Sequence, residues 1–146
     1  MANYQEAFDY AFSEKGEKYR CLHRSDELIC GQSLRSQGFS EVETRRLFKQ
    51  VYAFELWLEL KGEQILNQQA AGLLLLLNAR GYLSVMLNEM QNYFNINLSS
   101  KMCECTLNRI NALPEKRLNE WLVAGLDYFS LVENKQLQSM NHNIKA

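Results

Sequence analysis

Five consecutive leucines, Leu73–Leu77, limit the possible folds of this chain more than any other stretch does. At about 100° per residue, five successive positions go all the way round a helix, so they cannot form the single apolar face of a surface helix. Burying them contributes on the order of 8–15 kcal/mol before conformational entropy is subtracted. The run therefore predicts the central helix of a core. Another copy or a partner would cover any side that the fold leaves open.

A membrane-spanning helix is the alternative interpretation of the leucines. Asn78 and Arg80 follow them directly and would place an amide and a cation in hydrocarbon, and the chain has no window of about 18 apolar residues. The opening residues, MANYQEAFDYAFSEKGEKYR, have neither the basic start nor the apolar core of a secretory signal. We therefore expect no membrane association and a cytoplasmic location.

Residue types that favour helices dominate the chain. Proline occurs once, at Pro114, glycine occurs 7 times, and no stretch alternates in the manner of a half-buried strand. These features predict an all-α fold, a compact bundle of about six or seven helices around the Leu-rich helix. No linker rich in Pro, Gly or Ser divides the 146 residues. We expect a single helical domain over residues 1–140 and a frayed tail over 141–146.

Apolar spacing and end signals place the individual helices. They are expected over 4–12 with an end near residue 16 or 20, and over 26–37, 41–60, 68–80, 82–94 and 101–112, with a last helix beginning at Pro114. Asn67 is the expected cap of the Leu-rich helix and Gly81 its terminator. The last helix is expected to turn these residues inward: Leu118, Trp121, Leu122, Gly125, Leu126 and Phe129.

The helix over 41–60 has the clearest start signal. Ser40 and Glu43 have the spacing of a capping box, and Phe39 before the cap can pack on the first turn. Gly62 is expected to end the helix. The side chains expected to face inward are Phe48, Val51, Tyr52, Phe54, Leu58 and, with less support from the spacing, Trp57.

The cysteines do not form a recognisable metal site. Cys21 and Cys30, near His23, lack the short spacing that zinc sites use, and so do Cys103 and Cys105. The last two fall within a predicted helix, where residues two apart point about 200° away from each other. We expect free thiols and no metal.

Residues for catalysis are equally sparse. The two histidines, His23 and His142, lie in no nucleophile motif, and the chain has no Gly-rich phosphate loop. Glu55, Glu59 and Glu63 align at four-residue spacing, which is more typical of a solvated face than of an acid–base pair. The sequence predicts a protein that is not an enzyme and has no cofactor.

Basic residues are concentrated between positions 15 and 50, where eight positive and five negative charges give a local net charge of +3 in a chain of net charge -1. The segment over 26–52 has the outline of a helix-turn-helix. The candidate residues for nucleic-acid or partner binding are Arg35, Arg45, Arg46 and Lys49. Glu41 and Glu43 would lie at the turn that faces the bases, so a helical hairpin with solvated or internally paired arginines is the favoured interpretation.

Two stretches carry a family resemblance. DELICGQSLRSQGFSEVETRRLF and EQILNQQAAGLLLLLNARGYLSVMLNEM together cover about 50 of the 146 residues, and they resemble the bacterial Smg family of small helical proteins. In that family the first pattern is an acidic helix start, a Gly-Phe turn and a helix, and the second is a Leu-rich helix ended by glycine. The chain departs from the family at its start, in the shorter linker between the stretches and in the longer helices after Ser99. The resemblance implies a DNA-associated or regulatory adaptor and no catalytic residues.

An interaction protein is the function that these observations favour. The chain has more large aromatic and Met side chains than a small core needs, and some of them can form an exposed patch or a homodimer seam. They include Tyr4, Phe8, Trp57, Met86, Met90, Tyr93, Trp121 and Tyr128. We expect an adaptor, regulator or inhibitor that binds a protein partner or itself. A nucleic-acid-binding regulator is the alternative, and a small ligand inside the bundle also stays open because it would leave the same pattern.

Overall fold

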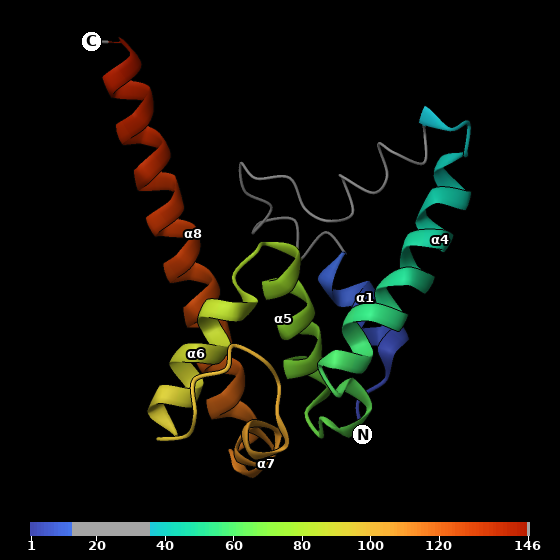
Figure 1. Ribbon diagram of the computed structural model, residues 1–146, viewed down its shortest axis with the longest axis vertical. Coiled ribbons are helices and arrows are strands. Elements are labelled where there is room, and N and C mark those ends of the chain that lie inside the picture. The colour runs from blue at the N-terminus through green and yellow to red at the C-terminus, as the bar shows by residue number, and fades with distance from the viewer. Residues whose placement is uncertain (13–35, 146) are drawn as a thin grey trace.

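The chain is all-α, as the sequence predicts. The computed structural model describes residues 1–12 and 36–145, and within this part of the chain no strand occurs (Figure 1). The elements are α1 (Tyr4–Ala11), α4 (Glu41–Tyr52), the π-helical η1 (Ala53–Trp57), the 3-10 helix η2 (Gly62–Gln64), α5 (Gln68–Ala79), α6 (Leu83–Tyr93), α7 (Glu104–Ala112) and α8 (Glu115–Lys145). The helix predicted over 26–37 lies almost wholly outside the described residues.

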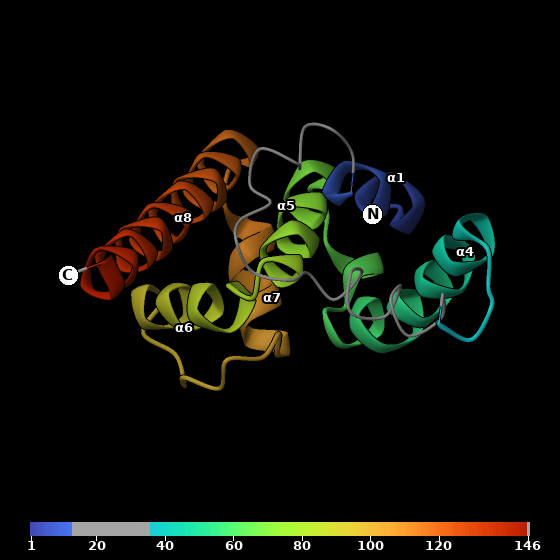
Figure 2. The same ribbon diagram turned by 90° about the horizontal axis from the view of Figure 1, so that it is seen from above.

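The Leu-rich helix α5 is the centre of the bundle. All five leucines of Leu73–Leu77 are fully buried, and α5 lies between α1 and α8 (Figure 2). Both predicted end signals are confirmed. The Asn67 side chain accepts a hydrogen bond from the Ala70 amide at 3.1 Å, and Gly81 has a φ of +80° just beyond the helix. The prediction of a core helix covered on all sides is therefore correct.

A glycine allows the first helix to approach α5 closely. A Cβ built at Gly72 would lie 2.8 Å from the Tyr10 ring, so a larger residue would push α1 away. Beside this contact, Phe8 of α1 and Phe12, its C-cap residue, pack against Phe48 and Tyr52 of α4, with ring centroids 5.6–6.2 Å apart. These aromatic contacts fix α4 to the bundle through α1.

The helix after Ser40 differs from its prediction in its middle. Its start is as expected, because Ser40 Oγ accepts a hydrogen bond from the Glu43 amide at 3.2 Å. After Tyr52 the helix widens into the π turn η1, which adds one residue to the turn. The buried apolar positions are therefore Phe48, Tyr52, Trp57 and Leu60, with a spacing of five between Tyr52 and Trp57.

Part of the predicted inner face is wrong. Val51, Phe54 and Leu58 are expected inside but are 49%, 78% and 64% exposed. Gly62 does not end the helix either. Lys61 takes the left-handed conformation, with a φ of 55°, and Gly62 packs beneath the Trp57 ring.

The second half of the chain follows its predicted order. Leu118, Leu122 and Leu126 of α8 are buried, and Trp121 and Phe129 pack against the core. Helix α7 begins at Glu104, so Cys103 is its N-cap. The prediction that Cys103 lies inside this helix is therefore wrong. Helix α8 continues to Lys145 through most of the segment expected to fray, since no glycine or proline follows Gly125. Figure 1 shows α8 and α4 diverging on either side of α5.

No membrane-spanning helix is present in the described part of the chain. The most apolar helix, α5, has 12 residues, and none of the described helices is both long and apolar enough to cross a bilayer.

Candidate functional site

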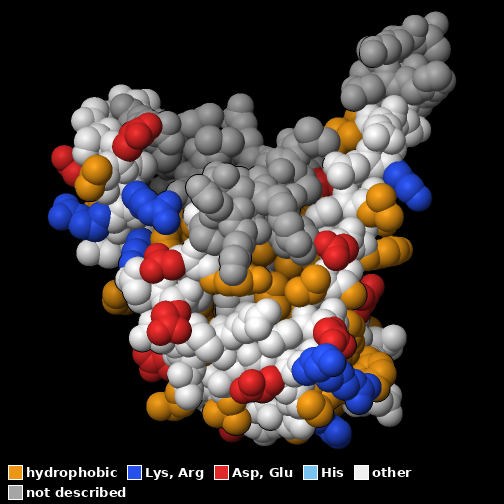
Figure 3. Space-filling model, turned by 180° about the vertical axis from the view of Figure 1, so that it is seen from behind, with side chains coloured by type: hydrophobic (Ala, Val, Ile, Leu, Met, Phe, Trp, Pro, Cys, Tyr) orange, Lys and Arg blue, Asp and Glu red, His pale blue; other side chains and the backbone are white. Residues whose placement is uncertain are grey.

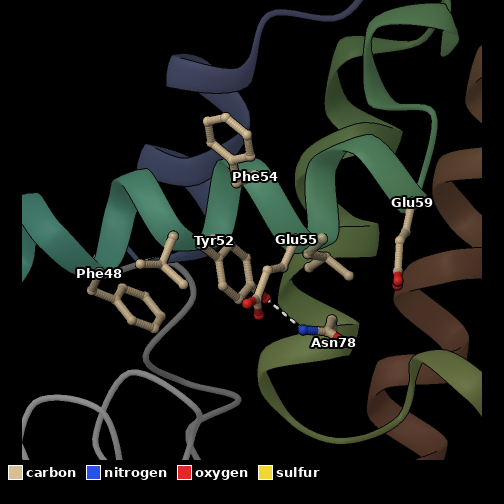
Figure 4. A pocket seen from close by; sticks show the side chains of 8 residues that line it. Phe48, Tyr52, Phe54, Glu55, Glu59 and Asn78 are labelled. Carbon is tan, nitrogen blue, oxygen red and sulfur yellow. Dashed lines mark hydrogen bonds between the residues drawn. The ribbon is translucent and has the colours of Figure 1, made fainter.

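Three exposed apolar side chains follow one another along the outside of α4 and η1. They are Val51, Phe54 and Leu58, which we call the apolar ridge. Spacings of three and four residues keep them on one side of the helix. In Figure 4, Phe54 projects from the opposite side of the ribbon to Phe48 and Tyr52, which face the interior. The π turn contributes to the ridge, because it turns Trp57 and Leu60 inward and leaves Leu58 exposed.

A groove runs beside the ridge, between η1 and α5. Its first part is a pocket of about 760 Å³ (Figure 4), and a second hollow of about 450 Å³ continues it toward α6. Leu56, Glu59 and Asn78 line both parts, so the two hollows form one feature, which we call the α5 groove. Val51 and Phe54 of the ridge also line its first part. The far end is mixed, and its lining includes Leu83, Leu87 and Met102 together with Ser84, Ser100 and Lys101.

The polar groups on the floor of the groove are bonded to one another. The Tyr52 hydroxyl donates to the Leu75 carbonyl at 3.3 Å and accepts from Asn78 Nδ2 at 2.7 Å, the bond drawn in Figure 4. Tyr52 is buried, so these bonds hold its ring against α5. The floor is therefore fixed in shape before any ligand arrives.

Two carboxylates on the groove wall have no such partners. Glu55 and Glu59 are exposed, and neither forms an ion pair or hydrogen bond with any residue in the described part of the chain. Both line the first pocket. Glu63, which the sequence aligns with them, lies beyond the left-handed turn at Lys61 and lines neither hollow. The exposed carboxylates fit the expected solvated face, although two of them border a groove.

The basic residues of α4 lie mostly against α1. The Arg45 guanidinium and the Lys49 ammonium are each 5.5 Å from the centroid of the Phe8 ring, and Lys49 Nζ also donates to Gln5 Oε1. Such cation–π contacts help to hold α1 and α4 together. Arg46 is exposed, and Arg35 lies outside the described residues. Of the four candidate binding residues, Arg45 and Lys49 therefore contact the same Phe8 ring, where they support the packing of α1 against α4.

Figure 3 shows the molecule from behind. Lys and Arg side chains gather on the upper part of the α4 side, with Asp and Glu side chains both above and below them. Charges of both signs are therefore interspersed along this side.

The thiols of the described residues form no metal site. Cys103 Sγ lies 2.9 Å from Thr106 Oγ1 and accepts from the Thr106 amide at 3.4 Å, which lowers the pKa of the Cys103 thiol, with the side-chain bond as the main cause. Cys105 is exposed. Residues 1–12 and 36–145 contain no group of three potential metal ligands. Cys21, His23 and Cys30 lie outside these ranges.

An apolar ridge beside a groove with carboxylates on its wall, on an all-α bundle, has a composition that is typical of protein-binding surfaces. No family model, curated protein or solved structure matches the chain. The resemblance to the Smg family therefore stays a prediction.

The sequence analysis missed the ridge for a specific reason. The segment has more apolar positions than one helical face can hold, and all of them were expected in the core. They are Phe48, Val51, Tyr52, Phe54, Trp57 and Leu58. That surplus is the signal that could have revealed a second apolar face. Nothing in the local sequence marks the π turn that decides which residues occupy it.

Proposed function

We propose that this protein is a non-enzymatic interaction protein, an adaptor, regulator or inhibitor, that binds a protein partner through the apolar ridge and the α5 groove. The observation that carries the proposal is the 78% exposure of Phe54 between two other exposed apolar residues, Val51 and Leu58. A large aromatic side chain held on a helix beside a groove is typical of the central contact of an interface. The groove adds a concave surface of the kind that takes a partner's helix.

The energetics support a contact of useful strength. Fully burying an exposed Val, Leu or Phe side chain contributes about 1.5–3 kcal/mol, and each ridge residue gains the share of this that corresponds to its exposed surface. The three residues are already held on a helix. The floor of the groove is held by the Tyr52 hydrogen bonds. Little ordering is therefore needed on binding, which favours affinity.

Site-specific photo-crosslinking tests the proposal. The photoreactive residue p-benzoyl-phenylalanine replaces Phe54 in one variant and Leu131, 54% exposed on α8, in a control variant, and both are expressed in the native host cells. We expect a discrete protein adduct at position 54 that is absent at position 131. The adduct should disappear when Val51→Asp and Leu58→Asp are added, while circular dichroism shows the same helix content.

The same experiment contains the outcomes that contradict the proposal. Identical adducts at both positions, or none at position 54, would remove it. An adduct with a nucleic acid would favour the alternative function, a nucleic-acid-binding regulator using the basic segment over 26–52 with Arg35, Arg45, Arg46 and Lys49. In that case binding to mixed-sequence DNA at about 50 mM salt should weaken on Arg46→Ala and on raising the salt concentration.

A further inference from the structure

We infer that the segment docking in the α5 groove is a basic amphipathic helix, with apolar side chains toward the ridge and Lys or Arg residues one turn apart toward Glu55 and Glu59. This inference rests on the proposed function and specifies the chemistry of the partner. It starts from the two carboxylates on the groove wall, which have no partner among the described residues. An unpaired charge beside an apolar surface selects a partner of opposite charge.

The spacing of the carboxylates supports a helical partner. Glu55 and Glu59 are four residues apart in a helical segment, so they lie about one turn apart along the groove. Two cations at positions i and i+4 of an opposing helix have the same separation. The apolar side chains of that helix then meet Val51 and Phe54 at one edge of the groove and Leu56 at its floor.

The two parts of the groove differ in charge. Among the described residues that line it, the first pocket has two carboxylates and no Lys or Arg. The described lining of the hollow toward α6 includes both Glu59 and Lys101. The negative potential is therefore concentrated beside η1, and the cations of the partner are expected there.

A second copy of this chain is a poorer occupant. In a twofold-symmetric dimer the same surface faces itself, so the ridge of one copy would meet the ridge of the other. Glu55 and Glu59 of both copies would then come together, and four like charges in one interface oppose association. A basic partner meets the same surface without this repulsion.

Fluorescence anisotropy with two designed peptides tests the inference. Both are labelled 18-residue amphipathic helices with the same Leu face, and their polar face is Lys in one and Glu in the other. We expect the purified full chain to bind the Lys peptide at least about tenfold more tightly than the Glu peptide, because opposite charges attract and like charges repel across an interface. Raising the salt concentration should weaken this preference.

Matched variants locate the effect. Glu55→Gln with Glu59→Gln should reduce the preference to less than about threefold, since the attraction is lost and the apolar contact is retained. Glu63→Gln with Glu89→Gln removes two exposed carboxylates outside the groove and should leave the preference unchanged. Phe54→Ala should weaken both peptides. A preference that survives Glu55→Gln with Glu59→Gln overturns the inference.

The outcomes separate this inference from the proposed function. If a protein adduct forms at position 54 but neither peptide binds, or the Glu peptide binds as tightly as the Lys peptide, the basic-helix inference is wrong and the docking function stands. If no adduct forms and neither peptide binds, both are wrong. An adduct with a second copy of the chain, together with a dimer in sedimentation that Phe54→Asp dissociates, identifies self-association and overturns the inference.

Discussion

Gly62 supports the indole ring of Trp57. A Cβ built on this glycine would lie 2.2 Å from Trp57 Cδ2, well inside van der Waals contact. We expect Gly62→Ala to reduce the free energy of unfolding by about 1–3 kcal/mol, the usual cost of overpacking. Urea denaturation measures it. Because Trp57→Leu removes the ring, Gly62→Ala should cost much less in that background, and equal costs in both backgrounds would contradict the proposed contact.

Gln91 fixes the loop between α6 and α7 from inside the protein. Its fully buried amide donates to Ser99 Oγ, the Lys101 carbonyl and Thr106 Oγ1, and its carbonyl accepts from the Ser99 and Ser100 amides. Gln91→Leu leaves several of these groups unsatisfied, and we expect a loss of about 2–4 kcal/mol. Hydrogen exchange at Ser99 and Ser100 should accelerate more than exchange in α5. Unchanged exchange at these two amides would show that the loop does not depend on Gln91.

At the scale of the element, local signals predicted three helix ends correctly, although Gly62 does not end its helix as expected. The Asn67 cap, the Ser40 cap and the Gly81 terminator act within a few residues of the chain, so sequence alone can reveal them. The π turn at Ala53–Trp57 has no such signal. With this turn Trp57 and Leu60 are buried and Phe54 and Leu58 are exposed, and which of them the core can accommodate depends on neighbours distant in sequence.

A pair of leucines tests the shifted helix face. Leu60 is 2% exposed and Leu58 is 64% exposed, although a continuous α-helix would favour Leu58 as the buried residue. We expect Leu60→Ala to cost about 2–5 kcal/mol of unfolding free energy. Leu58→Ala should stay within about 0.5 kcal/mol of the parent, as is usual at the surface. Thermal and urea unfolding of the two variants measure both losses. A larger loss for Leu58→Ala than for Leu60→Ala would mean that Leu58 is the buried residue, as the sequence predicts.

At the scale of the whole molecule, the α5 groove could not be predicted from the sequence. Glu55 and Glu59 are visible as an i, i+4 pair, but Asn78, Leu83 and Met102 reach the same groove from three later segments. Only the packing of η1 against α5 and α6 brings them together. The Leu-rich core was predictable because five successive leucines permit a single environment, whereas a surface of mixed residues permits many.

Glu133 couples the stability of the whole bundle to pH. It lies on α8, is 8% exposed and accepts a hydrogen bond from the Tyr82 hydroxyl, which comes from the start of α6. Burial raises the pKa of the Glu133 carboxyl above its ordinary value of 4.5. Between that value and the raised pKa, the folded chain binds more protons at this site than the unfolded chain does. The contribution of Glu133 to stability is therefore greatest at low pH and is lost as pH rises through this range.

Replacing the carboxyl with an amide isolates this effect. The free energy of unfolding of the parent minus that of Glu133→Gln should fall as pH is raised from about 4 to about 7, because only the parent must ionise a buried group. Urea denaturation at several pH values measures the difference. Glu89→Gln, at an exposed site on α6, is the control and should show no such trend. A parent-minus-variant difference that stays constant with pH would mean that Glu133 ionises as easily in the folded bundle as in the unfolded chain, and that the contact between α6 and α8 does not titrate.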